Sequence, residues 1–285
     1  MNLRAYIVPT AVIGIGIAWI GVPRVVNINR HEQRHELSHA HNLAAQSDWC
    51  NESRSNDSRG WHCEVREFEM SPGAFDGIDA GPNGGIEVSG WGRDAIHVLA
   101  KVEGRARQDD IAEALVSEVR IDMDGMALQA DGPKTERRES WSVSYRVSVP
   151  HMYDLDLNTV NGGISIENVN GNIEFSATNG GVSLTEVGGD VRGRTTNGGL
   201  KISLSGDQWD GTGLDVRTTN GGITFVLPDG YNAQLESATT NGSLSVDFPI
   251  TVSGRIDRRL RTQLGSGGPL LRAITTNGGV TIKQR

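Results

Sequence analysis

The sequence is poor in aromatic residues and cysteine, and these shortages restrict the fold classes open to it. Aromatic residues make up 5% of the 285 residues, whereas glycine occurs 37 times. So much glycine argues against a helical bundle. Hydrophobic residues still make up 36% of the chain, too many for a disordered protein. A chain of this length is enough for one or two domains with real cores.

Positive charge and catalytic motifs are also scarce. The net charge of −8 argues against nucleic acid as a partner. No nucleophile–base pair, carboxylate pair or phosphate-binding loop can be recognised, so we expect no catalytic residue, no cofactor and no enzyme. The only two cysteines, Cys50 and Cys63, allow at most one disulfide. We expect them to pair, and two free thiols are the alternative.

Residues 1–26 contain the most hydrophobic segment, which we interpret as a membrane anchor or a signal peptide. Residues 5–22 carry no charge, and this length lies at the lower edge of what spans a bilayer. The segment is therefore either an uncleaved anchor or a signal cleaved after Ala18, with a buried core segment as a third alternative. No cysteine follows the run, which excludes a lipoprotein signal.

We expect the protein to be exported, either periplasmic or anchored in the inner membrane and facing the periplasm or the cell surface. One observation argues against export. More arginines follow the apolar run than precede it, and the positive-inside rule therefore does not favour a C-terminal part outside the cytoplasm. The cysteine pair outweighs that point, because disulfides persist in oxidising compartments. The expected partners are the membrane, through the N-terminal segment, and an envelope protein or polysaccharide that the sequence does not identify.

Residues 27–60 form a polar, histidine-rich linker in which a metal could bind. The candidate ligands are His31, His35, His39 and His41. The first two belong to an HExxH pattern that, on a helix, would place both imidazoles on one face with Glu32 beside them. Ser38 replaces the glycine of the longer metalloprotease motif, and no cleft-forming domain surrounds the segment. A metal-binding tract and a solvated linker are therefore the interpretations that remain.

The folded domain is expected to cover residues 61–285, with a helix-containing section at 91–150. Alternating apolar residues predict a strand after Trp61, two strands joined at Gly90-Trp91-Gly92, and a strand that Pro150 ends. One helix is predicted from the helical spacing of its apolar residues, with an aspartate suited to cap it. These residues are Ile111, Leu115 and Val119, preceded by Asp109 and Asp110.

The tetrapeptide Asp122-Met123-Asp124-Gly125 has two interpretations. It resembles part of a calcium loop, but the downstream ligands are missing. We interpret it as a hairpin that turns at Asp124-Gly125, where glycine permits a positive φ.

An Asn-Gly motif recurs through residues 158–285, with one earlier copy. The copies lie at Asn83, Asn161, Asn179, Asn197, Asn220, Asn241 and Asn277. From the second copy onward the steps are 18, 18, 23, 21 and 36 residues, and the last step is twice 18. An apolar–polar–apolar triplet follows each of these copies, and in a strand it points two side chains inward and one outward.

These repeats predict a mainly β protein whose residues 158–285 form a parallel β-solenoid of about 18-residue coils. Two strands per coil would bury a core that no coil could bury alone. We expect Asn-Gly-Gly to supply a left-handed backbone at each corner, and asparagine and threonine to form ladders along the stack. The alternative is an antiparallel barrel with Asn-Gly hairpins. A hairpin tip, however, has no reason to repeat the flanking sequence Thr-Thr-Asn-Gly.

The triplets define which side chains should be buried and which should face solvent. The expected stacked core consists of Ile164, Ile166, Val182, Leu184, Leu200, Ile202, Ile223 and Phe225. The middle residues of the same triplets, Ser165, Ser183, Lys201 and Thr224, should face outward.

A basic cluster interrupts the last, longest step of the repeat. It comprises Arg255, Arg258, Arg259 and Arg261. These side chains could meet lipid head groups or an anionic polysaccharide, and a solvated insertion between coils is the alternative.

Residues 68–285 resemble the bacterial "putative adhesin" domain family, a family of unknown function with a β-solenoid fold. The matching motifs are GGIEVSGW, SYRVSVP, the repeated TTNGG, ITFVLPDGYNAQLESATTNG and the terminal GSGGPLLRAITTNGGVTI. The resemblance implies a structural role in the cell envelope and transfers no catalytic residue. We therefore expect a non-enzymatic, adhesin-like, scaffold or sensing protein. The alternative is an envelope protein that binds zinc or another metal through the histidine tract.

Overall fold

The computed structural model describes residues 49–52, 59–249 and 258–285, all within the compact unit Ala45–Arg285. The apolar N-terminal segment and the histidine tract therefore lie outside the described residues. Within the described ranges, no helix has the length and apolar character needed to cross a membrane.

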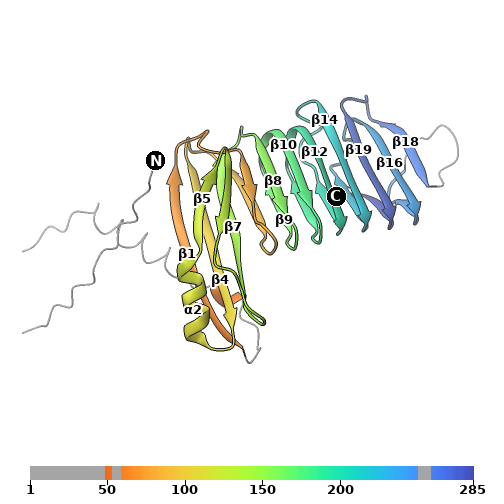
Figure 1. Ribbon diagram of the computed structural model, residues 1–285. Coiled ribbons are helices and arrows are strands. Elements are labelled where there is room, and N and C mark those ends of the chain that lie inside the picture. The colour runs from red at the N-terminus through yellow and green to blue at the C-terminus, as the bar shows by residue number, and fades with distance from the viewer. Residues whose placement is uncertain (1–48, 53–58, 250–257) are drawn as a thin grey trace, which may run out of the picture. The chain divides into compact units, whose positions relative to one another are not determined.

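Two ten-stranded sheets make up the unit, which is mainly β as predicted (Figure 1). In spatial order, the first sheet contains β1 (Gly60–Met70), β4 (Ile96–Ala106), β7 (Ser140–Pro150), β3 (Ile86–Trp91), β9 (Ile164–Glu167), β11 (Val182–Thr185), β13 (Leu200–Ser203), β15 (Ile223–Leu227), β20 (Val280–Gln284) and β17 (Leu244–Val246). The second contains β18 (Arg259–Leu264), β16 (Ala233–Asn241), β19 (Leu270–Asn277), β14 (Gly213–Asn220), β12 (Gly188–Asn197), β10 (Asn170–Ala177), β8 (Leu155–Thr159), β2 (Gly77–Asp79), β6 (Ala127–Asp131) and β5 (Arg120–Asp124).

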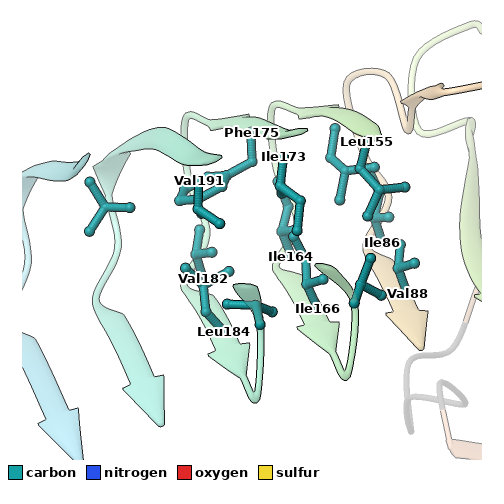
Figure 2. Packing of buried hydrophobic residues seen from close by; sticks show 14 of the residues in the cluster. Ile86, Val88, Leu155, Ile164, Ile166, Ile173, Phe175, Val182, Leu184 and Val191 are labelled. Carbon is teal, nitrogen blue, oxygen red and sulfur yellow. The ribbon is translucent and has the colours of Figure 1, made fainter. Parts of the chain in front are cut away.

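The repeats pair in parallel, one strand of each coil in each sheet. Val182 lies opposite Ile164 on one side and Leu200 on the other, so equivalent triplet positions stack from coil to coil. All eight predicted core residues are buried between the sheets, and Figure 2 shows four of them there. The parallel pairing confirms the solenoid and contradicts the antiparallel barrel.

The coils do not stack in the order of the sequence. The coil of Asn277 lies between those of Asn220 and Asn241, because β20 separates β15 from β17 and β19 separates β14 from β16. The earliest copy, at Asn83, joins the stack through β2 and β3, which pair with β8 and β9. The 36-residue step is therefore not two regular coils, since it contains β18, which runs antiparallel to β16.

An asparagine ladder runs along the exposed corner of the whole stack. Each Nδ2 donates to the Oδ1 of the asparagine in the adjacent coil, at 2.7 to 3.1 Å. In order, the ladder comprises Asn83, Asn161, Asn179, Asn197, Asn220, Asn277 and Asn241. The predicted asparagine ladder is thus confirmed.

The first glycine after each asparagine is required by a close approach, and of these glycines only Gly278 has the positive φ that the sequence predicted for every corner. Gly198 has no positive φ. A Cβ atom added to it would lie 1.9 Å from the carbonyl oxygen of Gly180 in the adjacent coil. The same approach recurs at Gly162 and Gly221, at 1.9 and 2.0 Å. Only a residue without a Cβ lets the coils stack this closely.

Buried threonines use these same carbonyl oxygens. The Oγ1 of Thr195 donates to the Gly180 oxygen at 2.8 Å, and that of Thr218 donates to the Gly198 oxygen at 2.7 Å. The threonines at equivalent corners therefore connect neighbouring coils, as expected, but their hydroxyls bond to glycine carbonyl oxygens and not to one another. The arrangement satisfies a polar side chain that would otherwise be buried without a partner.

The N-terminal section follows its predicted elements with two differences. β3 and β4 are not neighbours, because β7 lies between them. The helix α2 (Asp109–Glu118) is preceded by Gln108 as its N-cap, whereas the Asp109 side chain accepts a hydrogen bond from the Trp61 backbone nitrogen. The hairpin of β5 and β6 is confirmed, with Gly125 at φ 62°.

Tyr145→Phe is expected to leave the unfolding free energy unchanged or to raise it by about 1 kcal/mol. The Tyr145 hydroxyl is buried and has no hydrogen-bond partner in the described part of the chain. Burial, with a smaller contribution from the Asp79 charge, raises the pKa of this phenol. Urea unfolding would measure the change. A loss above about 1 kcal/mol would show that the hydroxyl has a stabilising partner.

Candidate ligand-binding groove

A groove of about 770 Å³ crosses the outer face of the first sheet. Seven consecutive strands line it, namely β4, β7, β3, β9, β11, β13 and β15. At about 4.8 Å between neighbouring strands, the groove runs for about 29 Å along the stack. Such a length suits an extended ligand better than a compact one.

The floor of the groove is a row of the second glycines of the Asn-Gly-Gly motifs. It comprises Gly85, Gly163, Gly181, Gly199 and Gly222. None of them has a positive φ, and a Cβ atom on them would lie 3.3 to 3.5 Å from its nearest neighbour. The coil of Asn241, which lies outside the groove, carries Ser243 at the equivalent position. Coil stacking therefore tolerates a side chain at this position. Because the five coils of the groove have glycine here instead, this position adds no side chain to the floor.

One wall presents a row of polar side chains, one from each coil. Ser165, Ser183, Lys201 and Thr224 lie in register on adjacent strands. Lys201 is exposed and the three hydroxyl residues are half-buried, as their outward orientation predicts. Within the described ranges none of these four side chains has a hydrogen-bond or ion-pair partner. Their donors and acceptors are available to a ligand.

Trp49 closes one end of the groove. Its indole is 7% exposed, and two cations lie against it. The Cζ of Arg146 is 4.2 Å and the Nζ of Lys101 is 5.2 Å from a Trp49 ring centroid. The Arg146 guanidinium also contacts a carboxylate oxygen of Glu87 at 2.9 Å. This end therefore combines an aromatic surface with fixed charges.

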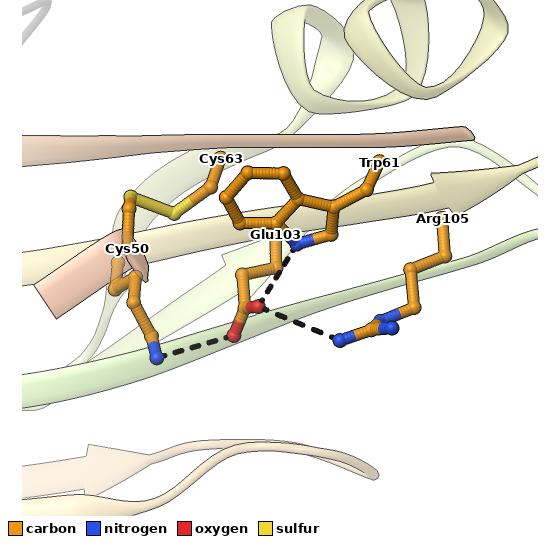
Figure 3. The surroundings of a disulfide bond; sticks show 6 residues. Cys50, Trp61, Cys63, Glu103 and Arg105 are labelled. Carbon is orange, nitrogen blue, oxygen red and sulfur yellow. Dashed lines mark hydrogen bonds and ion pairs between the residues drawn. A yellow bond between two sulfur atoms is a disulfide. The ribbon is translucent and has the colours of Figure 1, made fainter. Parts of the chain in front are cut away.

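The Cys50–Cys63 disulfide holds Trp49 in place. It joins the helical residues 49–52 to β1, and the two cysteines are 13 positions apart in the sequence. Figure 3 shows Glu103 beside the disulfide, where it accepts a hydrogen bond from Trp61 Nε1 at 3.3 Å. The sequence places residues 49 and 50 in the linker, but both are buried. Folded structure thus begins before Trp61.

Replacing both cysteines with serine is expected to lower the unfolding free energy by about 3 kcal/mol. The disulfide stabilises the protein by restricting the unfolded chain, and this is the usual size of that effect for a loop this short. The double variant and the reduced wild-type protein should have the same urea midpoint, and it should be lower than that of the oxidised wild-type protein. Alkylation before reduction should label neither thiol. Equal stability of the oxidised and reduced proteins would contradict the expectation.

The sequence-predicted metal ligands, from His31 to His41, lie outside the described residues. The described part of the chain contains no group of three or more potential metal ligands. Nothing there supports the metal-binding alternative. Sequence reasoning placed the wall residues outward but missed Trp49. The signal available was a tryptophan next to a cysteine expected to pair.

One protein family and several solved structures are similar to this chain. The family model described as Toastrack DUF4097 matches residues 118–283. No curated protein matches. A "putative cell adhesion protein" from Clostridium sporogenes is 12% identical, with 79% of this chain and 100% of that chain covered and a TM-score of 0.39.

Two further solved structures match this chain with similar sequence identity, coverage and TM-score. A "putative adhesin" from Bacteroides fragilis is 14% identical, with 79% and 97% covered and a TM-score of 0.34. A "putative lipid binding protein" from Parabacteroides distasonis is 12% identical, with 78% and 96% covered and a TM-score of 0.33. Likenesses at these levels assign no ligand to this chain.

Proposed function

This chain belongs to the Toastrack DUF4097 family, and from its groove we propose that it is a non-enzymatic, adhesin-like protein of the cell envelope that binds an extended polysaccharide. The observation that supports this most is the repetition along the groove. Each coil contributes one glycine to the floor of the groove and one outward polar side chain to its wall. These contributions repeat at the distance between neighbouring strands. A polymer with a repeating unit can make an equivalent contact at more than one coil.

The chemistry of the groove favours a polysaccharide over a peptide. The backbone groups beside the floor already pair between neighbouring strands, so an added peptide strand could not use them for β-augmentation. The serine and threonine hydroxyls and the Lys201 amine can instead exchange hydrogen bonds with sugar hydroxyls. At one end, beside the buried Trp49, the Lys101 and Arg146 side chains lie against the indole ring.

Export to the periplasm or the cell surface is part of the proposal. A disulfide between Cys50 and Cys63 is stable in such an oxidising compartment. Cell fractionation should recover the protein with the membrane or the periplasm. Recovery in the cytosol would overturn this part of the proposal.

Cosedimentation of the full chain with insoluble envelope material tests the ligand class. Binding should survive protease treatment of the material and should be lost after periodate, which cleaves the vicinal diols of sugars. Binding that protease abolishes and periodate leaves intact would point to a protein partner and contradict the proposal. So would the absence of any binding.

A further inference from the structure

The outer face of the second sheet has an excess of arginine that the groove does not explain. Strands β12, β14, β16, β18 and β19 carry six arginines and three acidic residues, in a chain whose net charge is −8. The arginines are Arg192, Arg194, Arg217, Arg259, Arg261 and Arg272, and Arg258 directly precedes β18. Arginines therefore outnumber acidic residues on these five strands of an acidic protein, whereas the adjacent strands β10 and β8 carry the exposed Glu174 and Asp156.

One row of this face is neutralised internally. Arg272 lies 3.3 Å from a carboxylate oxygen of Asp215 and 3.6 Å from one of Glu236. Arg261 contacts Glu236 at 2.8 Å. The hydrogen bond from Arg261 lowers the pKa of Glu236, so the glutamate stays ionised and the row keeps its alternating charges. These side chains have their partners within the protein.

The neighbouring row is neutralised only at Arg217. Arg194 and Arg217 lie directly opposite each other on the adjacent strands β12 and β14, and both are exposed. Like charges at directly opposite positions of a sheet are destabilising. Arg217 has Asp215 at 3.1 Å, whereas Arg194 has no partner among the described residues. Arg259 of β18, in the same row, has none either.

Two hollows accompany these arginines. A hollow of about 440 Å³ is lined by three arginines, of which Arg194 and Arg217 are two, and by the carboxylates of Asp156, Glu174 and Asp215. A second hollow, of about 600 Å³, is lined by Arg258, Arg259 and other residues of β16, β18 and β19. Arg217 and Arg259 are three strand steps apart, about 14 Å. Both hollows lie along one line across the sheet.

We propose that this arginine face binds a linear polyanionic polysaccharide, whose anionic groups bridge Arg194 and Arg217 and extend to Arg259. Guanidinium groups recognise carboxylate, sulfate and phosphate through paired hydrogen bonds, and a shared anion would relieve the repulsion between the two opposed arginines. A membrane surface fits less well. Within these five strands Leu270 is the only exposed large hydrophobic residue. The inference does not depend on the groove, which lies on the other sheet.

Equilibrium binding of the full chain to dextran sulfate, with neutral dextran as the control polymer, tests the proposal. The wild-type protein should bind dextran sulfate only, and more weakly as salt rises. Replacing Arg194, Arg217 and Arg259 with glutamine should lower the affinity at least tenfold. A control variant with the same charge change, in which the exposed Arg107, Arg120 and Arg137 become glutamine, should lose less than threefold.

The single variant Arg194→Gln separates a binding role from a structural one. Its melting temperature should equal or exceed that of the wild type, because a like-charge contact is removed, while its dextran sulfate affinity falls. Equal losses in the two triple variants would mean that only net charge matters, and would overturn the proposal. Binding to anionic phosphatidylglycerol vesicles without binding to dextran sulfate would overturn it in favour of a lipid surface.

Discussion

Gly198→Ala is expected to destabilise the solenoid by about 3 kcal/mol or more, the upper end of the usual cost of overpacking. The added Cβ would lie 1.9 Å from the Gly180 carbonyl oxygen, which belongs to the backbone of the adjacent coil and cannot rotate away. That oxygen also accepts the hydrogen bond of Thr195. Relieving the clash would therefore pull two coils apart. Urea unfolding measures the loss.

The next residue provides the matched control. A Cβ on Gly199 would lie 3.3 Å from the Gly222 carbonyl oxygen, so Gly199→Ala should cost about 1 kcal/mol or less. Gly198→Asn separates the two explanations for the glycine. Asparagine tolerates a left-handed backbone, so it would be accepted if conformation were the cause, and rejected like alanine if close approach is the cause. Equal midpoints for Gly198→Ala and Gly199→Ala would contradict the close approach.

Leu200→Ala is expected to cost about 2–5 kcal/mol through the cavity that it leaves. Leu200 is 2% exposed and lies in register between Val182 and Ile223, so the surrounding coils have little room to collapse into the space. Lys201→Ala, on the outer face of the same strand, should change the unfolding free energy by less than about 0.5 kcal/mol. Similar urea midpoints for the two variants would contradict the assigned faces of β13.

The periodic part of the fold could be predicted because a period of two fixes which side chains point inward. The triplets around Ile164 and Leu200 identify the core without any structure. The order of the last coils could not be predicted. The triplets after Asn220, Asn241 and Asn277 are alike, so local sequence does not specify which coil stacks on which. That order depends on the path of the chain through β18.

The two candidate surfaces were only partly visible in the sequence, because each is assembled across coils. Ser183 and Lys201 were expected to face outward, but the groove arises from glycines of five coils aligned in space. Arg258 and Arg259 form a cluster in sequence, whereas Arg194 and Arg217 are 23 positions apart and become neighbours only through strand pairing. Arg255 of the predicted cluster lies outside the described residues.

Filling the groove with a bulky side chain is a direct test of polysaccharide binding there. Ser183→Trp places a bulky side chain on the wall of the groove. Ser245→Trp makes the same substitution in the same row, on β17 beyond the groove. The measurement is the equilibrium affinity of each full-length variant for protease-treated envelope polysaccharide, beside its melting temperature. We expect at least a tenfold loss of affinity for Ser183→Trp and none for Ser245→Trp, with both proteins folded. Wild-type affinity in a folded Ser183→Trp protein would contradict binding in the groove.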